Sequence, residues 1–332
     1  MSKPYLSIVI AGRNDHYGGD FKERLQHCFS LTYSQLTTYE IYSEIIFVNY
    51  NPLSEPNIEQ FINWQVSNKF VTVKIITVPA EVHLALIESG ERKNVPMLEY
   101  CAKNVGIRIS AGEYILCLNP DILLPDEFFK NVYLLNKHTY YCADRIDFRN
   151  FDSNNKPQEI FRISMKGHAY DYSISNPLSF WFLKLKNYLL CKWKYHSKKH
   201  RFFFERRNWN IYFHNIEYRY HCNVSGDFML MHKSIWEQLK GYSEQTYISL
   251  HVDALMVIQA ASLGLKEKVI SSPIYHKEHS RRYDSTHENP EYRNAYLFFE
   301  REAQKMLAEK KPTIYNDENW GLNNFILKEQ VI

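Results

Sequence analysis

The sequence Tyr114–Pro125, YILCLNPDILLP, joins a short apolar run to an abrupt polar end. A run such as Tyr114–Leu118 is typical of a strand in the middle of a sheet that is covered on both faces. A proline cannot continue the ladder, so the strand must end at Asn119-Pro120-Asp121. Ligands bind at the carboxyl ends of strands in open α/β sheets, and a carboxylate there suits a divalent cation that carries phosphates. Asp121 is equally well interpreted as the cap of a helix that begins near Pro125.

Strands and helices alternate before this stretch. Apolar runs predict strands over residues 5–11, 44–50 and 70–78. Apolar residues at helical spacing predict three helices. The first begins near residue 20, the second covers residues 56–66 and the third covers residues 97–109. The alternation favours an α/β fold with a Rossmann-like, mostly parallel central sheet flanked by helices. The polar ends of the strands should then converge on one crevice.

The second half is less regular. Residues 144–222 are aromatic and basic, show no alternation of strands with helices, and end in an alternating, strand-like run over 218–223. Within them, Pro177–Tyr195 mixes Trp, Phe and Leu with lysines, which predicts a helix that packs on the core or, alternatively, an interfacial helix or a flap over the acceptor. Strands near 225–231 and 268–275 and helices over 234–240, 253–263 and 291–310 follow.

Composition narrows the class of protein. With 332 residues, 45% hydrophobic and 23% charged, the chain is long enough for a sizeable core. A net charge of +3 is too small for a dedicated nucleic-acid binder, so no nucleic-acid partner is expected. The six cysteines have no CxxC spacing and are expected to be reduced. The sequence has no signal peptide pattern and no run of about 18 apolar residues, so we expect a cytoplasmic protein without a transmembrane segment, in which peripheral membrane contact is left open.

Several motifs follow one another in a recognisable order. The first strand runs into Ala11-Gly12-Arg13-Asn14, the second ends at Asn49-Tyr50-Asn51, and a helix carries Ala102-Lys103-Asn104-Val105-Gly106. Asn119-Pro120-Asp121 comes next, and Ser225-Gly226-Asp227 and a stretch from Gly241 through Asp253 to Gly264 follow it. In order and spacing these motifs resemble the inverting, nucleotide-sugar glycosyltransferases of family 2, which have the A-type fold. The resemblance covers roughly residues 5–125 and 223–282.

The resemblance implies one glycosyltransferase-like domain over residues 1–332. It would consist of a nucleotide-sugar-binding half (1–143), an aromatic and basic insertion (144–222), an acceptor half (223–290) and a C-terminal helix and tail (291–332).

For the donor, the resemblance implies contacts from Ala11, Gly12, Arg13, Asn49, Lys103 and Asn104. Asn49 stands where the family usually has an Asp that pairs with the base, and Lys103 stands where it has an Arg. Asp121, with Asn119, would hold Mn²⁺ or Mg²⁺ against the diphosphate, although the family usually has two carboxylates in this motif.

Downstream residues complete the expected site. The resemblance implies that His276 is a further metal ligand, and that Arg281 and Arg282, with His279 in reserve, contact phosphate; a solvated basic loop is the alternative. Asp253 would be the general base for the acceptor hydroxyl or, alternatively, only a helix N-cap. Asp227 would bind acceptor hydroxyls or, alternatively, only form a turn.

The function most consistent with these residues is transfer of a hexose or deoxyhexose from a UDP- or dTDP-sugar to a glycan, glycolipid or glycoprotein acceptor. A catalytically silent nucleotide-sugar or glycan-binding module on the same fold is the alternative. A dinucleotide- or methyl-donor-dependent enzyme would need a glycine-rich turn after the first strand, and Gly12-Arg13-Asn14 does not form one.

Overall fold

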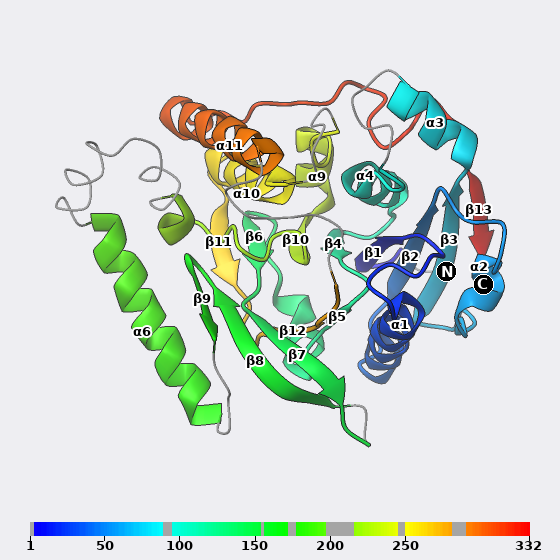
Figure 1. Cartoon of the computed structure of the whole chain (residues 1–332), viewed down its shortest axis with the longest axis horizontal. Coiled ribbons are helices and arrows are strands. Elements are labelled where there is room, and N and C mark those ends of the chain that lie inside the picture. Colours follow the sequence, from blue (N-terminus) through cyan, green and yellow to red (C-terminus); the bar gives the residue numbers. More distant parts are fainter. Residues whose placement is uncertain are drawn as a thin grey trace.

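A sheet of eight strands organises the computed structural model, which describes residues 3–88, 95–153, 156–171, 177–196, 216–244, 250–280 and 290–332. The strands lie in the order β11-β6-β10-β4-β1-β2-β3-β13 (Figure 1). Their bounds in that order are Lys266–Val269, Thr139–Cys142, Phe228–His232, Tyr114–Leu118, Leu6–Gly12, Ser43–Tyr50, Val71–Val78 and Lys328–Val331.

Most of this sheet is parallel. Strands β4, β1, β2 and β3 are parallel neighbours, and β11 pairs in parallel with β6. Strands β10 and β13 run in the direction opposite to the rest of the sheet, since β10 is antiparallel to both β4 and β6, and β13 is antiparallel to β3. The predicted α/β class with a mostly parallel central sheet is therefore confirmed.

Helices cover both faces of the sheet. Every residue of β1 is buried although alternate side chains point to opposite faces, which shows that neither face is open to solvent at this strand. Ile8 and Ile10 pack in the core that contains α1 (Phe21–Thr38) and α5 (Asp126–Lys130). Val9 packs in the core that contains α9 (Lys233–Leu239), α10 (Val252–Ser262) and α11 (Pro290–Glu309). Helix α4 (Glu99–Ile109) contacts β1 and β2. The remaining helical elements of this part are α2 (Ile58–Phe61), α3 (Ala80–Glu88) and η1 (Val132–Leu134).

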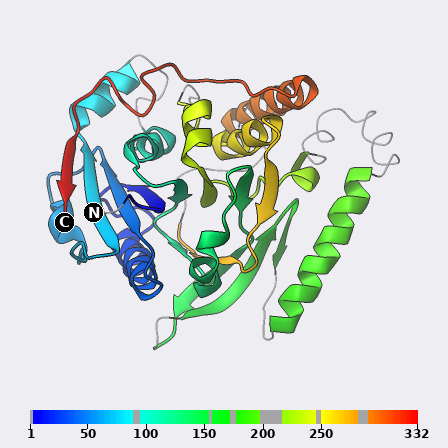
Figure 2. The ribbon, with the colours of Figure 1, turned by 180° about the vertical axis from the view of Figure 1, so that it is seen from behind.

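A second sheet lies beside the first. Its order is β5-β12-β7-β8-β9, with bounds Ile122–Leu123, Ile274–Lys277, Arg145–Phe151, Pro157–Met165 and His168–Asp171. Helix α6 (Pro177–His196) lies along its outer side, at the rim of the molecule in both views (Figures 1 and 2). No helix among the described residues is long and apolar enough to cross a membrane.

The structure corrects three of the predicted elements and adds strands that were not predicted. The strand predicted over 268–275 is two strands, β11 and β12, which belong to different sheets because Pro273 lies between them. The run 218–223 is not a strand, and the helix predicted over 56–66 is the single turn α2. Residues 144–171 contain the antiparallel strands β7, β8 and β9, which the sequence analysis missed. The prediction of reduced cysteines agrees with the structure, where all six are free and buried.

Candidate active site

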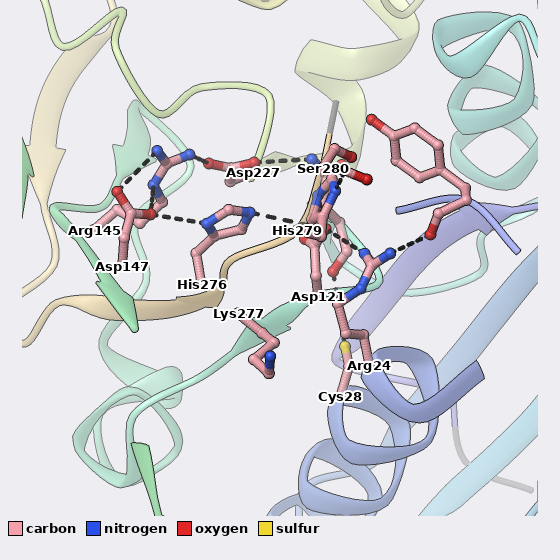
Figure 3. Close-up of polar contacts among 12 residues, drawn as sticks. Arg24, Cys28, Asp121, Arg145, Asp147, Asp227, His276, Lys277, His279 and Ser280 are labelled. Carbon is pink, nitrogen blue, oxygen red and sulfur yellow. Dashed lines mark hydrogen bonds and ion pairs between the residues drawn. The ribbon is translucent and has the colours of Figure 1, made fainter. Parts of the chain in front are cut away.

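Asp121 follows β4 and occupies the polar edge that the sequence predicted. It is 5% exposed and does not cap α5, whose N-cap is Pro125. Its Oδ2 atom lies 3.1 Å from Nη1 of Arg24, 3.0 Å from Nε2 of His279 and 3.9 Å from Nε2 of His276. The helix-cap interpretation is therefore wrong, and Asp121 instead lies at the centre of a charged cluster (Figure 3).

Strand pairing explains how His276 reaches this cluster. His276 lies on β12, opposite Ile122 of β5 on one side and Asp147 of β7 on the other. Because Ile122 directly follows Asp121, this register places His276 between Asp121 and Asp147. His276 contributes from within strand β12, and not from just after the strand that the sequence predicted to end at residue 275.

Both imidazoles are oriented by the nitrogen that faces away from Asp121. Nδ1 of His276 lies 2.8 Å from Oδ1 of Asp147, and Nδ1 of His279 lies 2.8 Å from the carbonyl oxygen of Ser280. Both partners are acceptors, so each Nδ1 donates to its partner. Nε2 of each ring therefore faces Asp121, and Nε2 of His279 donates to the carboxylate at 3.0 Å. A histidine whose Nδ1 is held by a carbonyl or carboxylate partner presents Nε2 as its metal-binding atom, so both rings are oriented as they are in metal sites.

The electrostatics around Asp121 favour its charged form. Burial alone would raise the pKa of Asp121, but the hydrogen bond from His279 and the charges of His276, His279 and Arg24 hold it well below its usual range. Its Oδ1 atom is buried and has no hydrogen-bond partner among the described residues. A buried oxygen without a partner is costly, so this atom is suited to an additional ligand.

Asp121, His276 and His279 could together hold a metal ion. One ligand atom from each lies within 4.8 Å of the others. A carboxylate and two imidazoles form a donor set that suits first-row divalent metals. The residues present therefore fit the ion that the sequence analysis expected, with His279 in addition to the predicted Asp121 and His276.

Arg145 connects this cluster to Asp227, the residue that the sequence analysis expected to bind acceptor hydroxyls. Its guanidinium pairs with Oδ2 of Asp227 and, at 2.9 Å, with Oδ1 of Asp147 (Figure 3). Burial lowers the pKa of Arg145, but the two carboxylates outweigh that effect and raise it. Arg145 and Asp147 were missed from the sequence. The signal was their spacing of two residues in the run Arg145-Ile146-Asp147-Phe148, which places both charges on one face of a strand.

Asn119 extends the network of hydrogen bonds from Asp227 to Lys103, away from the three candidate metal ligands. Its Nδ2 donates to Oδ1 of Asp227 at 2.8 Å, and its Oδ1 accepts from Nζ of Lys103 at 2.7 Å. The buried Lys103 ammonium also donates to Glu99 and to the carbonyl of Gly226, each at 2.7 Å. Both ends of the Asn119 side chain are thus held within the protein.

Asp253 lies next to Gly226, in the first turn of α10. A Cβ atom on Gly226 would come within 3.0 Å of Oδ2 of Asp253, and the Ser225 hydroxyl donates to the same oxygen at 2.9 Å. The N-cap of α10 is His251, so Asp253 is not the cap. Burial raises the pKa of Asp253, although the hydrogen bond from Ser225 and the charge of Lys103 act in the opposite direction.

The other predicted donor residues divide into two groups. Gly12, after Ala11 at the end of β1, lies opposite Asn49 of β2, whose buried Oδ1 has no partner among the described residues. Arg13 donates from Nε to the carbonyl of Asn51 at 2.6 Å. Asn104, by contrast, exchanges hydrogen bonds with the Tyr242 backbone and donates to Glu244, so its amide is fully used in packing. Arg281 and Arg282 lie outside the described residues.

Comparisons with known proteins identify similar structures but no similar sequence. No protein-family model and no curated protein sequence matches the chain. Among solved structures, Staphylococcus aureus TarS residues 1–349 has a TM-score of 0.44 at 10% identity, over 92% of this chain and 70% of TarS. The same protein in complex with UDP-GlcNAc matches equally well, with 71% of that chain covered. The catalytic domain of Drosophila β1,4-galactosyltransferase 7, in complex with xylobiose, has a TM-score of 0.39 at 11% identity, over 88% of this chain and 79% of that one. Because these scores are low, an assignment of function must rest on the geometry of the site itself.

Proposed function

We propose that this chain transfers a sugar from a nucleoside-diphosphate sugar to an acceptor hydroxyl, with a divalent cation held by Asp121, His276 and His279. The observation that supports it best is the convergence of two oriented Nε2 atoms on a buried carboxylate that has one oxygen without a partner. The position of this cluster after β4, the central strand of a mostly parallel sheet, is where a phosphate-bearing ligand is expected.

Mn²⁺ suits these residues better than Mg²⁺. Mg²⁺ takes oxygen ligands almost exclusively, whereas imidazole nitrogen is a common ligand of heavier divalent metals. When bound, the cation would neutralise the negative charge that develops on the departing diphosphate.

Asp253 is the proposed general base. Its half-buried carboxylate would accept the proton of the acceptor hydroxyl as that hydroxyl attacks the anomeric carbon, and attack from the side opposite the diphosphate would invert the configuration there. A raised pKa favours this role because it makes the carboxylate a stronger base near neutral pH. Asp227, held in place by Arg145 and Asn119, is the proposed contact for acceptor hydroxyls.

Asn49 is the proposed reader of the base. Its buried Oδ1 atom has no partner among the described residues and is able to accept a hydrogen bond from the N3–H group that uracil and thymine share. This chemistry supports a UDP- or dTDP-sugar as the donor. The acceptor is proposed to be a glycan, glycolipid or glycoprotein.

The first test measures metal binding without turnover. We expect the electron paramagnetic resonance signal of free Mn²⁺ to fall as wild-type protein is added, and Asp121→Asn to weaken Mn²⁺ binding about tenfold or more because it removes the charged ligand. The matched control is Asp126→Asn, an exposed aspartate on α5, which should bind as the wild type does. Failure of the wild type to bind Mn²⁺, with or without UDP, would rule out the metal site.

The second test measures chemistry. Purified protein, a panel of nucleotide sugars and Mn²⁺ should release nucleoside diphosphate slowly from one donor, and this release should stop with a chelator or in Asp121→Asn. If one nucleotide sugar raises the melting temperature but is never consumed with any acceptor, the protein is a binding module and not a transferase.

A further inference from the structure

The outer face of α6 exposes a row of large apolar side chains. They are between 43% and 63% exposed, and apolar side chains that are exposed side by side mark a site of interaction. In sequence order they are Trp181, Phe182, Leu185, Tyr188, Leu189 and Trp193. Their spacing places them together on one side of the helix, along most of its length. No described element lies outside α6 in either view of the molecule (Figures 1 and 2).

The inner face fixes which side of α6 points outward. Phe180 and Leu183 pack against the core of the second sheet. Asn187 donates to the carbonyl of Lys166 at 3.1 Å and accepts from the Tyr170 hydroxyl at 2.7 Å. These buried contacts specify the rotation of the helix about its axis, so the exposed apolar row is a defined property of the fold.

The charge on α6 has a single sign. The helix contains four lysines and no acidic residue. Lys184 pairs with Asp144 and Lys194 donates to Tyr218, so both are engaged on the inner side. Lys186 and Lys192 are exposed, and the helical repeat places Lys192 within the apolar row and Lys186 at its margin.

We propose that this outer face of α6 docks on the surface of an anionic lipid bilayer. Trp and Tyr are favoured at the level of lipid headgroups, and Phe and Leu gain free energy by entering the acyl boundary. Exposed lysines beside them attract anionic headgroups. A protein partner fits this face less well, because lysine is depleted in the core of protein interfaces, whereas Lys192 lies within the apolar row.

This inference does not depend on the proposed transferase activity. Adsorption to a bilayer needs neither a donor nor a metal ion. A failure of either proposal therefore leaves the other to be judged separately.

The test is flotation of the full chain with lipid vesicles, measured as a partition coefficient. We expect the wild type to float with vesicles of phosphatidylcholine and phosphatidylglycerol in equal parts. It should float less with phosphatidylcholine alone and less in high salt, because salt screens attraction between surface charges. Tryptophan fluorescence should shift to the blue on binding, since Trp181 would leave water.

Two paired variants separate the apolar and the charged contributions. Phe182→Ser with Leu189→Ser should weaken binding about tenfold or more, because two apolar side chains no longer enter the bilayer. Lys186→Gln with Lys192→Gln should weaken binding to anionic vesicles by about tenfold and leave binding to neutral vesicles unchanged. Because all four side chains are exposed, these variants should keep the melting temperature of the wild type.

Matched controls use exposed residues elsewhere. Leu134→Ser with Ile326→Ser and Lys305→Gln with Lys311→Gln remove similar groups outside α6 and should float as the wild type does. The proposal is overturned if the wild type fails to float with anionic vesicles, or if the α6 variants and the controls float equally. It is also overturned if the wild type is an oligomer that the Phe182→Ser, Leu189→Ser variant dissociates and that does not bind vesicles, since the face would then join two copies of this chain.

Discussion

At the scale of single residues, the site consists of charges that are buried only because each has a partner. Asp147 pairs with His276 and Arg145, Asp227 pairs with Arg145, and Asp121 pairs with Arg24 and His279. Removing one member of such a pair leaves the other charge buried and uncompensated. The exception is Asp253, whose closest hydrogen-bond partner is the neutral Ser225.

Asp253→Asn should therefore separate activity from stability. If Asp253 is the base, sugar transfer should fall about a hundredfold or more, because the amide cannot accept the acceptor proton. The melting temperature at neutral pH should stay the same or rise, because burial penalises the charge that this change removes. Calorimetry and a transfer assay on the same preparation measure both effects, and a variant that transfers sugar at the wild-type rate would eliminate Asp253 as the base.

The same carboxylate has a predicted pH signature. Burial raises the pKa of Asp253, so the folded state holds its proton more tightly than the unfolded state does. The contribution of this group to stability should decline as pH rises from the ordinary pKa of an aspartate to the raised one, and then remain constant. The transfer rate should change in the opposite sense, falling as pH drops through the raised pKa. Stability and transfer rate, each measured as a function of pH, should show these two changes in the wild type and not in Asp253→Asn. Identical pH profiles for the two proteins would contradict the prediction.

Sequence reasoning located Asp121, His276 and Asp253 because each follows or begins an element with a clear apolar pattern. It did not find Arg145 or Asp147. Their strand, β7, lies in a region where aromatic residues hide the alternation of side chains, and their partners come from β12 and from Asp227, which no local pattern connects to them. Long-range register, rather than local propensity, assembles this part of the site.

At the scale of elements, α4 shows how one small residue sets the spacing between a helix and the sheet. Gly106 lies against β1, where an added Cβ would come within 2.3 Å of Cγ1 of Val9. Lys103, one turn earlier, reaches Asn119 and Gly226 from the same helix. The distance between α4 and the sheet therefore also positions the ammonium group within the polar network.

Gly106→Ala should destabilise the protein, although alanine favours helix formation. The gain in helix propensity is about 1 kcal/mol, whereas forcing a methyl group into packed Val9 costs about 1–3 kcal/mol. Adding Val9→Ala should relieve the clash, so the double variant should be more stable than the sum of the two single changes predicts. Denaturant unfolding of all four proteins measures this coupling, and strict additivity would show that the close contact carries no strain.

Elements with a simple hydrophobic pattern were predicted within a few residues. The strand over 114–118 matches β4, and the helices over 253–263 and 291–310 match α10 and α11 with a shift of one residue. The failures lie where pairing decides the structure. Residues 268–275 are apolar enough for one strand, yet they contribute to two sheets.

At the scale of the whole molecule, segments that are distant in sequence complete one sheet. Strand β13 closes the edge of β3, where the amide of Ile332 donates to the carbonyl of Val73 at 3.0 Å. The carbonyl of Ile332 in turn accepts from the amide of Ser67 at 2.9 Å. An edge covered in this way is protected from pairing with another chain.

Ile332→Pro tests this closure, because proline has no amide hydrogen to donate to Val73. It should lower the free energy of unfolding by about 1 kcal/mol more than the matched variant Ile332→Ala, which keeps the hydrogen bond. Hydrogen exchange should also become faster at the Ser67 amide in the proline variant alone. Equal exchange in the two variants would show that the edge closes without this bond.

The position of β13 in the sequence also has a consequence for synthesis of the protein. Strands β1, β2 and β3 are complete within the first 78 residues, but the strand that covers β3 is made only at residues 328–331. During translation, the edge of β3 therefore stays uncovered until α4, the second sheet and α6 have been synthesised. A nascent chain in this state exposes backbone groups that can pair with other chains, so its yield in the cell should depend on chaperones that bind it during translation.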